Sequence, residues 1–354
     1  MIQRKAAAAR GARVSCRLLL SFVSCCGAAG AVFADAPAGA SRWSLLEDND
    51  GMVTHDDKHY TQGFRFSDLL PEPEPGGMQQ GVLDAAAAVL PPYREAAGDV
   101  RRMEWIALGQ SIFTPSDTHR NPPDPKDRPY AGWLYTGLAL FNEHDGQGLD
   151  SLELLGGVVG PWALARQAQN TFHRVFSFGN SYGWSSQLAN RGAVQFSFDR
   201  KQRFSYRFNR GPAIDAIPEA GFSVGNVFRY VDAGAMLRFG NALDVDYGPE
   251  RIRPAASGTG WFNERADHSG GPRFYLFTGM QTRWVFENVF LDGATGLGLP
   301  GLARKPAVTD FYAGGAFLFA HDLRADFSAT RRGREFGSQG ADDIFGSASL
   351  TLSL

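Results

Sequence analysis

The chain has 354 residues, a formal net charge of −2 and three cysteines. The nearly balanced charge gives no basic footprint for nucleic acid, so nucleic-acid binding is not expected. The cysteines, Cys16, Cys25 and Cys26, all lie near the N-terminus, so the rest of the chain has neither disulfides nor thiolate metal ligands.

The N-terminal segment has the pattern of a secretory signal peptide. Basic residues precede the apolar run 18–31, and Val32-Phe33-Ala34 is a small-residue cleavage site. Lipidation at Cys25 is an alternative, but Phe22 is a poor residue three places before it. We therefore predict a signal peptide over 1–34 and one domain over 35–354. That domain has no apolar stretch of the length that a transmembrane helix needs, so it is either soluble or a membrane β-barrel.

Apolar and polar residues alternate in many segments of this domain, including 60–67, 194–199, 203–208, 323–330 and 348–354. Alternation gives each strand one apolar and one polar face. The apolar faces are rich in Phe and Tyr while the polar faces carry charges, as in a barrel with a polar lumen. A soluble β-sandwich also alternates. The secretory signal, the cysteine-free domain and the amphipathic last strand favour an all-β, transmembrane antiparallel barrel with short helical segments in its loops.

About twelve strands are expected, an even number as in bacterial single-chain barrels. We place them at 42–50, 60–69, 102–113, 130–143, 149–160, 191–200, 203–211, 222–239, 272–290, 307–320, 323–333 and 343–354. Tight turns at 144–148, 199–202 and 321–322 would mark the periplasmic end. The external end would then carry 51–59, 114–129, 161–190, 212–221, 291–306 and 334–342. Two insertions, 70–101 and 240–271, fall on the periplasmic side, and the first is predicted to hold a helix over 82–90.

Oxygen-bearing side chains flank the first expected connection. Asn49 and Asp50 end one strand, and Thr61 begins the next with its side chain predicted on the lumen face. Carboxylate, amide and hydroxyl oxygens are ligands for a hard cation such as calcium. The spacing is not that of an EF-hand, and Asp and Asn also occur in ordinary loops. The residues alone therefore leave both interpretations open.

The connection 161–190 holds a polar segment of helical length with His173 inside it. Long connections are uncommon unless they have a function. His173 is a candidate general base because histidine exchanges protons near neutral pH. Gln169 lies one helical turn earlier and is expected on the same face. A surface histidine on a loop helix is the alternative. No serine is recognised in a nucleophile-elbow context, so a covalent serine mechanism has no direct support.

A set of motifs, in order along the domain, resembles the outer-membrane lipid A 3′-O-deacylase (LpxR-type) family. The motifs are NDGMVTHDDKHYTQGFRFS at 49–67, DRPYAGWLYTGL at 127–138, GPWALARQAQNTFHRV at 160–175, GWSSQL at 183–188, YGPERIRP at 247–254 and FLDG at 290–293. The resemblance implies a twelve-stranded outer-membrane barrel. By the strand count its active site would face outward, because the expected connections 51–59, 114–129 and 161–190 all lie at the external end. Its activity would be calcium-dependent hydrolysis of the 3′-linked acyl groups of lipid A in lipopolysaccharide.

The resemblance also implies roles for single residues. His173 matches the family's base, and Gln169 matches its motif glutamine. Asn49, Asp50 and Thr61 match the calcium site or its shell.

The second expected loop is basic, with Arg120, Lys126 and Arg128, and such cations suit lipopolysaccharide phosphates. Arg120 falls near a family residue that supports the oxyanion or binds phosphate. The family also has a glutamate shortly after the histidine, where this chain has Gly179 or Asn180. A non-catalytic barrel of the same family therefore remains an alternative. An outer-membrane phospholipase is a second alternative, which should need a serine nucleophile. A monomer is favoured, although the sequence does not fix the oligomeric state.

Overall fold

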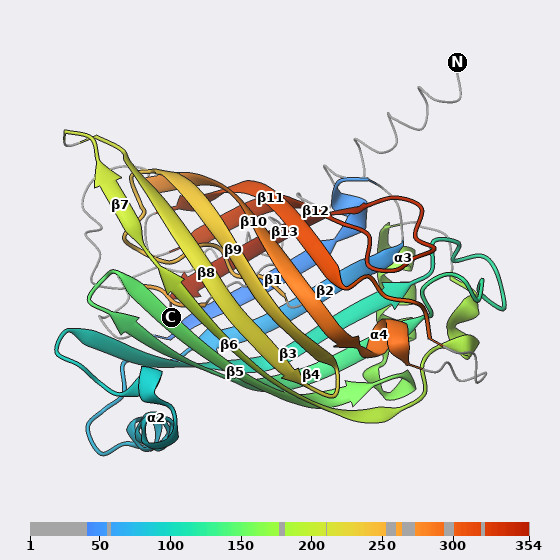
Figure 1. The fold of residues 1–354 in the computed structure, drawn as a ribbon, viewed down its shortest axis with the longest axis horizontal. Helices are drawn as coiled ribbons and strands as arrows, with labels where there is room; N and C mark the ends of the chain where they lie inside the picture. The colour runs from blue at the N-terminus through green and yellow to red at the C-terminus, as the bar shows by residue number, and fades with distance from the viewer. Residues whose placement is uncertain are drawn as a thin grey trace.

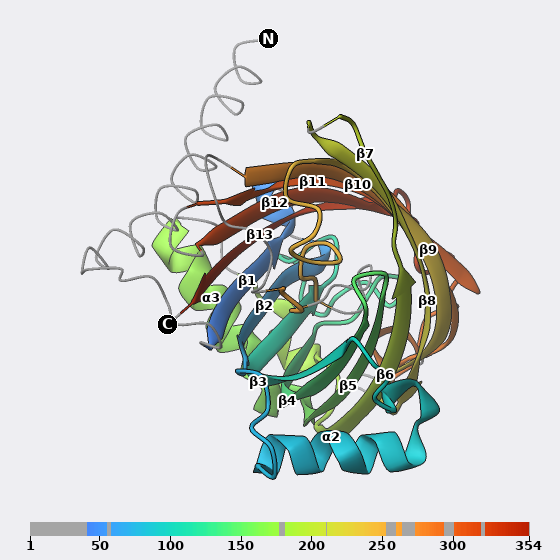
Figure 2. The ribbon, with the colours of Figure 1, turned by 90° about the vertical axis from the view of Figure 1, so that its left-hand side faces the viewer.

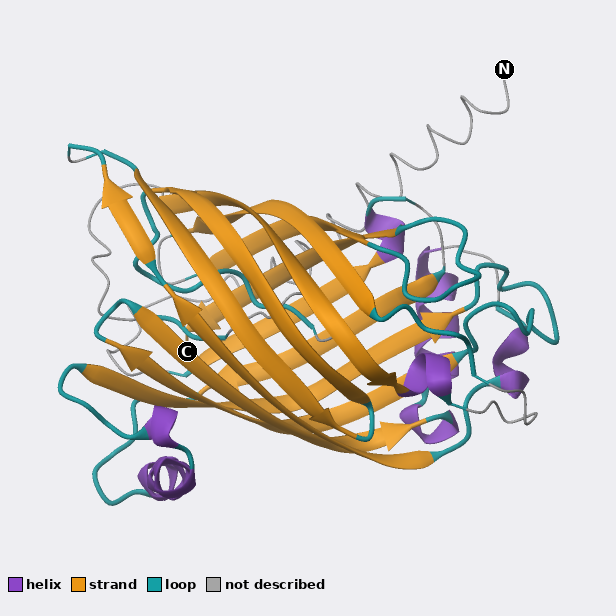
Figure 3. Cartoon of the chain, in the orientation of Figure 1, coloured by secondary structure: helices purple, strands orange, loops and turns teal. Residues whose placement is uncertain are grey.

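The computed structural model describes residues 41–54, 58–176, 181–209, 211–252, 260–263, 273–293, 301–319 and 323–353. Over these ranges the chain forms an antiparallel barrel with helical segments at both ends (Figure 1, Figure 3). None of the helices in these ranges is long and apolar enough to cross a membrane. The predicted signal peptide lies outside the described residues.

The strands are β1 (Arg42–Asn49), β2 (His59–Leu69), β3 (Asp99–Thr114), β4 (Ala131–His144), β5 (Gly148–Val159), β6 (Arg191–Gln202), β7 (Phe204–Arg207), β8 (Ala213–Gly225), β9 (Phe228–Gly240), β10 (Arg273–Asn288), β11 (Ala307–Leu318), β12 (Arg324–Arg332) and β13 (Asp343–Ser353). The helices are α2 (Met78–Val89), α3 (Ala165–Phe176) and α4 (Val289–Asp292). Short 3₁₀ turns are η1 (Asp50–Met52), η2 (Pro91–Tyr93), η3 (Pro161–Ala163) and η4 (Gly183–Ser186).

Twelve strands close the barrel, as predicted. β1 pairs with both β2 and β13, so the first and last strands are neighbours. The short β7 continues β6, and both pair with β8, so β6 and β7 together count as one strand of the wall. Among the described strands, closure leaves no free edge that could pair with other chains. The end of the barrel that carries α2 and the opposite end that carries α3 are called here the α2 end and the α3 end (Figure 1).

The predicted strand assignment is wrong between 199 and 239. Residues 199–202, predicted as a tight turn, lie inside β6, and the chain turns instead at 208–212, where the amide of Phe208 donates to the carbonyl of Pro212 (3.1 Å). Residues 212–221, predicted as an external loop, fall mostly in β8, and the predicted strand 222–239 contains the end of β8 and most of β9. The predicted number of strands was still correct, because the false turn at 199–202 added one strand and the missed turn between β8 and β9 removed one.

The cause of this error is the polar lumen. Lys201 in the DRKQR run has the composition of a turn, yet its ammonium group is buried and ion-paired with Glu219 of β8. Charged side chains that face a polar lumen can find partners there, so charge does not mark a turn in such a strand. The insertion helix, predicted over 82–90, begins earlier, as α2 at Met78.

The two faces of the wall differ as a membrane barrel requires. Large apolar side chains are exposed on the outward face of many strands, among them Trp105, Leu138, Leu154, Val194, Leu276, Trp284 and Phe311. In the lumen, Arg65 lies 3.0 Å from Glu104, 3.1 Å from Glu153 and 3.2 Å from Glu250. An apolar outer belt around a charged lumen is the arrangement of outer-membrane barrels.

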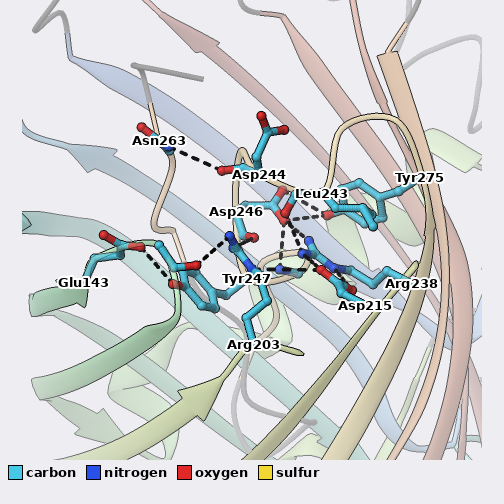
Figure 4. Close-up of polar contacts among 12 residues, drawn as sticks. Glu143, Arg203, Asp215, Arg238, Leu243, Asp244, Asp246, Tyr247, Asn263 and Tyr275 are labelled. Atoms are coloured by element: carbon cyan, nitrogen blue, oxygen red, sulfur yellow. Dashed lines mark hydrogen bonds and ion pairs between the residues drawn. The ribbon is translucent and has the colours of Figure 1, made fainter. Parts of the chain in front are cut away.

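The insertion that follows β9 enters the lumen instead of leaving the barrel (Figure 2). Asp246 accepts from Arg238 (2.6 Å) and from the hydroxyl of Tyr275 (2.9 Å). Tyr247 donates to Glu143 on the opposite wall (2.8 Å), and Figure 4 shows these contacts together. The described part of this insertion therefore fills the lumen and ties β4, β9 and β10 together from inside.

Candidate functional site

Helix α3 is held closely against the wall at its first turn. A Cβ atom at Gly132 of β4 would lie 2.4 Å from Cβ of Ala165, so only glycine allows this approach. Gln110 of β3 donates its side-chain amide to the carbonyl of Ala163 (2.6 Å). Leu164, directly before the helix, has a left-handed backbone with φ of 57°. The helix is thus fixed to β3 and β4 by contacts of its N-terminal end.

α3 lies on the outer side of the wall, outside the ring of strands in Figure 2. Ile112 of β3 packs with Tyr130, Ala165 and Trp184 in one buried cluster. The next residue, Phe113, packs instead with Tyr60 and Phe290 in the cluster that fills the lumen at the α3 end. Because neighbouring side chains on a strand point to opposite faces, Ile112 marks the outer face and Phe113 the inner face.

The buried face of α3 carries the predicted base. Gln169 is 1% exposed and His173 is 5% exposed, although the helix lies at the rim of the barrel. Their four-residue spacing places them on one face, as predicted. Burying polar side chains is costly unless they are partnered. The position of His173 therefore reflects a specific environment and not the solvent-facing loop helix of the alternative.

Trp184 fixes the orientation of Gln169. Its indole N–H donates to Oε1 of Gln169 (2.8 Å), and its ring lies 4.8 Å from the ring of Tyr130. A Cβ at Gly183 would lie 2.4 Å from the Tyr130 ring, so the close approach of η4 requires glycine here. Sequence reasoning did not select Tyr130 or Trp184 as site residues. The GWSSQL and DRPYAGW motifs contain these two residues and could have pointed to them.

Asn170, beside Gln169, is also of interest. Its Oδ1 is buried and has no hydrogen-bond partner among the described residues. A buried polar atom of this kind often marks a functional group or a bound water. It lies in the GPWALARQAQNTFHRV motif, between Gln169 and His173, and that motif could have pointed to it.

Asn49 and Asp50 lie at the same end of the barrel. Oδ1 of Asn49 accepts from the amide of Gly51 (2.7 Å) and so caps the start of η1. Oδ2 of Asp50 accepts from the amide of Lys58 (2.7 Å), which closes the β1–β2 connection. Both side chains are buried. Sequence reasoning therefore placed them correctly at the end of β1, and the structure adds that their oxygens help to shape the turn.

Thr61 does not face the lumen, contrary to the prediction. A β-bulge shifts the register between Tyr60 and Gln62. Tyr60 remains inside, where it donates to Asp48 (2.9 Å), while Oγ1 of Thr61 lies 2.7 Å from Oγ1 of Thr114. Thr114 follows Ile112 by two residues on β3, so its side chain points to the same, outer face. The bulge thus turns Thr61 to the side of the wall on which α3 packs, a known use of bulges near functional sites.

The oxygen atoms at this connection fit a hard cation. Asn49, Asp50 and Thr61 offer an amide, a carboxylate and a hydroxyl oxygen, and all three residues are buried. A carboxylate oxygen that accepts one amide hydrogen still has lone pairs for a metal. In the described ranges no group of three His, Cys, Asp or Glu residues is arranged to hold a metal. An oxygen-rich site with a single carboxylate is compatible with calcium and unlike a zinc site.

Arg120 is half exposed and pairs with Asp124 (2.8 Å). Arg120 lines a cleft of about 460 Å³ together with His59, Ser116, Lys126 and Gln339. Its backbone carbonyl lies near η4, 3.1 Å from where a Cβ at Gly183 would be. The structure therefore brings the backbone of Arg120 to the α3 site but directs its side chain to Asp124.

An ionic cluster around His59 borders this cleft. Nδ1 of His59 lies 2.7 Å from Asp343, and Nε2 lies 3.2 Å from Asp127 and 3.0 Å from Oγ of Ser116. Burial by itself raises the pKa of Asp127, but hydrogen bonds from His59 and from the amides of Ser116 and Arg128 lower it to about 2. The cluster therefore ties the connection after β3 to the starts of β2 and β13.

Arg128 is fully buried and pairs with Glu335 (2.7 Å), so its part in the basic loop is structural. Gly179 and Asn180, where the family glutamate is missing, lie outside the described residues.

Comparison with known proteins identifies similar chains. The family model described as "Outer membrane protein LpxR" matches residues 18–354. The structure of LpxR from Salmonella typhimurium is similar with a TM-score of 0.69 at 19% identity, over 88% of this chain and 100% of that one. The beta domain of the Bordetella autotransporter BrkA follows with a TM-score of 0.43 at 11% identity, over 90% and 100%. No curated protein sequence matches.

Proposed function

This chain belongs to the LpxR family of outer membrane proteins, and on that premise we propose that it hydrolyses the ester-linked acyl groups at the 3′ position of lipid A. The observation that carries the proposal is the burial of His173 and Gln169 on the face of α3 that packs against the outer wall. A site on the outside of the wall is open to a lipid from the membrane, whereas a site in the lumen is not.

His173 acts as the general base in this proposal. Its imidazole takes a proton from water, and the water oxygen attacks the carbonyl carbon of the ester. When the tetrahedral intermediate collapses, the bond to the sugar oxygen breaks and that oxygen takes the proton from the imidazolium. The products are a carboxylic acid and the free 3′-hydroxyl of the sugar. Gln169, held by Trp184, orients the groups around His173.

Asn49, Asp50 and Thr61 would hold a calcium ion on the outer face. When bound, the ion supplies Lewis-acid stabilisation of negative charge on the carbonyl oxygen. The bulge at Thr61 supports this assignment, because it brings the hydroxyl to the face on which α3 lies.

Arg120 stabilises the same negative charge or binds a lipid A phosphate. To do so it must leave Asp124. An exposed ion pair is weak because water screens it, so a phosphate or an oxyanion can replace the carboxylate.

We place the α3 end of the barrel outside the cell. Lipid A lies in the outer leaflet, and the α3 end carries the long connection 160–190. The turn at 145–147 and the hairpin tip at 208–212 lie at the α2 end, which fits the short periplasmic turns of such barrels.

The test is lipid A mass spectrometry on cells that express the wild type, His173→Ala or Arg174→Ala. Loss of a general base typically costs 10²- to 10⁴-fold in rate, so His173→Ala should leave the 3′-acyl groups on lipid A. Arg174 is an exposed neighbour on α3, and its variant should behave as the wild type. Chelation of calcium should stop the wild-type reaction.

The same experiment separates the alternatives. Continued deacylation by His173→Ala would refute the proposed mechanism. Release of fatty acid from phospholipid alone would identify a phospholipase, and unchanged lipids would identify a non-catalytic barrel. The filled lumen weighs against an open pore in the described part of the chain, because Arg65 and Arg238 bind acidic groups of the insertion across it.

A further inference from the structure

Three rows of paired residues cross the outer face of β3, β4, β5 and β6. The row nearest the α3 end is apolar and consists of Trp105, Leu138, Leu154 and Phe196. The next is also apolar and consists of Met103, Leu140, Leu152 and Phe198. The last is polar and consists of Arg101, Asn142, Asp150 and Arg200. The apolar belt therefore ends between the second and third rows.

Helix α2 covers the second row. Leu83 is fully buried against Met103, Leu140 and Leu152, and Tyr93 completes this cluster. The cluster covers part of the apolar belt at its boundary nearest the α2 end.

Two polar contacts fix α2 there. Asp84 pairs with Arg101 of the polar row (3.0 Å). The hydroxyl of Tyr93 donates to the carbonyl of Leu140 (2.9 Å). The helix is therefore a fixed part of the outer wall at the α2 end.

The opposite face of α2 is apolar and exposed. Met78 is 83% exposed, Val89 is 75% exposed, and Val82 and Ala85 are also exposed. The spacing of these four residues places them in one stripe along the helix. Asp84 is the one charged residue among Met78–Val89, and it is held by Arg101. The outward stripe therefore carries no charge of its own.

We propose that α2 is a membrane-interface helix whose stripe of Met78, Val82, Ala85 and Val89 enters the phospholipid of the leaflet at the α2 end. The stripe is continuous with the lipid-facing belt, because α2 packs directly beside the exposed row that contains Trp105 and Leu154. α2 is seen end-on in Figure 1 and lengthwise beneath the strand ends in Figure 2, so it runs across the barrel's long axis.

This orientation is that of helices which lie in the membrane plane with the apolar face about 5–10 Å into the boundary between headgroups and acyl chains. The polar row beside it, with Arg101 and Arg200, lies where the phosphates of the headgroups would be. The role is independent of the proposed hydrolysis.

The experiment places a fluorescent label at Val82→Cys in a background where Cys16, Cys25 and Cys26 are alanine. The purified chain is reconstituted in vesicles of phosphatidylethanolamine and phosphatidylglycerol. Quenching is measured with nitroxides on the lipid acyl chains and with iodide in the water. Leu154→Cys on the exposed belt and Glu74→Cys on the exposed connection before α2 are the matched controls.

We expect the label at Val82→Cys to be quenched by the lipid nitroxides as Leu154→Cys is, and to be several-fold less accessible to iodide than Glu74→Cys. Equal iodide quenching at Val82→Cys and Glu74→Cys would overturn the proposal. Protection from both quenchers in native outer-membrane fragments would also overturn it, because a protein partner would then cover the stripe. Val82 is exposed, so its replacement does not disturb the packing of α2.

Discussion

Trp184 donates its indole N–H to Oε1 of Gln169 over 2.8 Å, and this bond joins the η4 turn to the buried face of α3. An indole can only donate, so the contact fixes which end of the Gln169 amide faces Trp184. Gln169 lies one turn before His173, and η4 thereby controls the surroundings of the proposed base although it follows that residue in the chain.

Trp184→Phe should slow 3′-acyl release without unfolding the barrel. The change removes the donor but keeps a ring that can pack on Tyr130. Loss of one hydrogen bond costs about 0.5–1.5 kcal/mol, which corresponds to a roughly 2- to 13-fold lower rate. Rate measurements on purified protein check this, with the exposed Trp162→Phe as control. Equal effects of the two changes would show that the bond to Gln169 does not matter.

Gly132→Ala should displace α3 and reduce activity while the barrel stays folded. The added methyl group would lie 2.4 Å from Cβ of Ala165, closer than packed carbons allow. Gly156→Ala on β5 is the matched control, because nothing lies within 4 Å of its Cβ position. Activity and heat-dependent gel mobility are measured together. Full activity of Gly132→Ala would contradict the inferred docking of α3.

Thr61→Val should raise the calcium concentration needed for half-maximal activity. The valine keeps the shape of threonine but removes the oxygen that the bulge directs to the outer face. Thr61→Ser keeps that oxygen and should restore calcium dependence close to the wild type. An unchanged calcium requirement in Thr61→Val would exclude Thr61 from the ion's ligands or its shell.

Arg65→Ala should destabilise the barrel strongly. Glu104, Glu153 and Glu250 surround the guanidinium, and removing one partner of a buried ion pair costs about 3–5 kcal/mol. Arg229→Ala breaks a half-exposed pair with Glu287 and should cost no more than about 1 kcal/mol. Thermal unfolding in detergent compares the two variants, and similar midpoints would contradict the structural role of Arg65.

Asp127→Asn should lower stability at neutral pH, and the difference from the wild type should shrink in acid. The pKa of Asp127 is about 2 in the folded chain, below the usual value of about 3.9, because its hydrogen bonds outweigh burial. A lowered pKa stabilises the fold above about pH 4, and this contribution is lost as the pH falls toward 2. Unfolding midpoints between pH 2 and 7 test this window, with Asp145→Asn at an exposed turn as control. A difference that does not depend on pH would contradict the assigned charge.

The barrel itself could be predicted because alternation is a local property of the sequence. Each strand shows its apolar and polar faces without reference to its neighbours. The error at 199–239 arose where the polar face carried Lys201 and its partner Glu219 lay on another strand. A charge in a turn and a charge in a polar lumen look the same in sequence, and pairing across strands distinguishes them.

The candidate site was partly predictable for a similar reason. The helical spacing of Gln169 and His173 correctly placed both on one face. The face of Thr61 was predicted wrongly, since a bulge is set by the register of β2 against β3 and leaves the local alternation unchanged. Trp184 was missed because its hydrogen bond depends on a turn that packs back onto α3.

By itself, the sequence determined the kind of molecule: a closed antiparallel barrel of twelve strands, and its family. These follow from periodicity and motifs, which neighbouring residues carry on their own. Only the tertiary structure decided that the described part of the insertion after β9 fills the lumen, that α3 lies on the outer wall, and that Thr61 faces the same side. Each of these depends on register and on long-range packing, because a side chain's environment is set by what the fold brings against it.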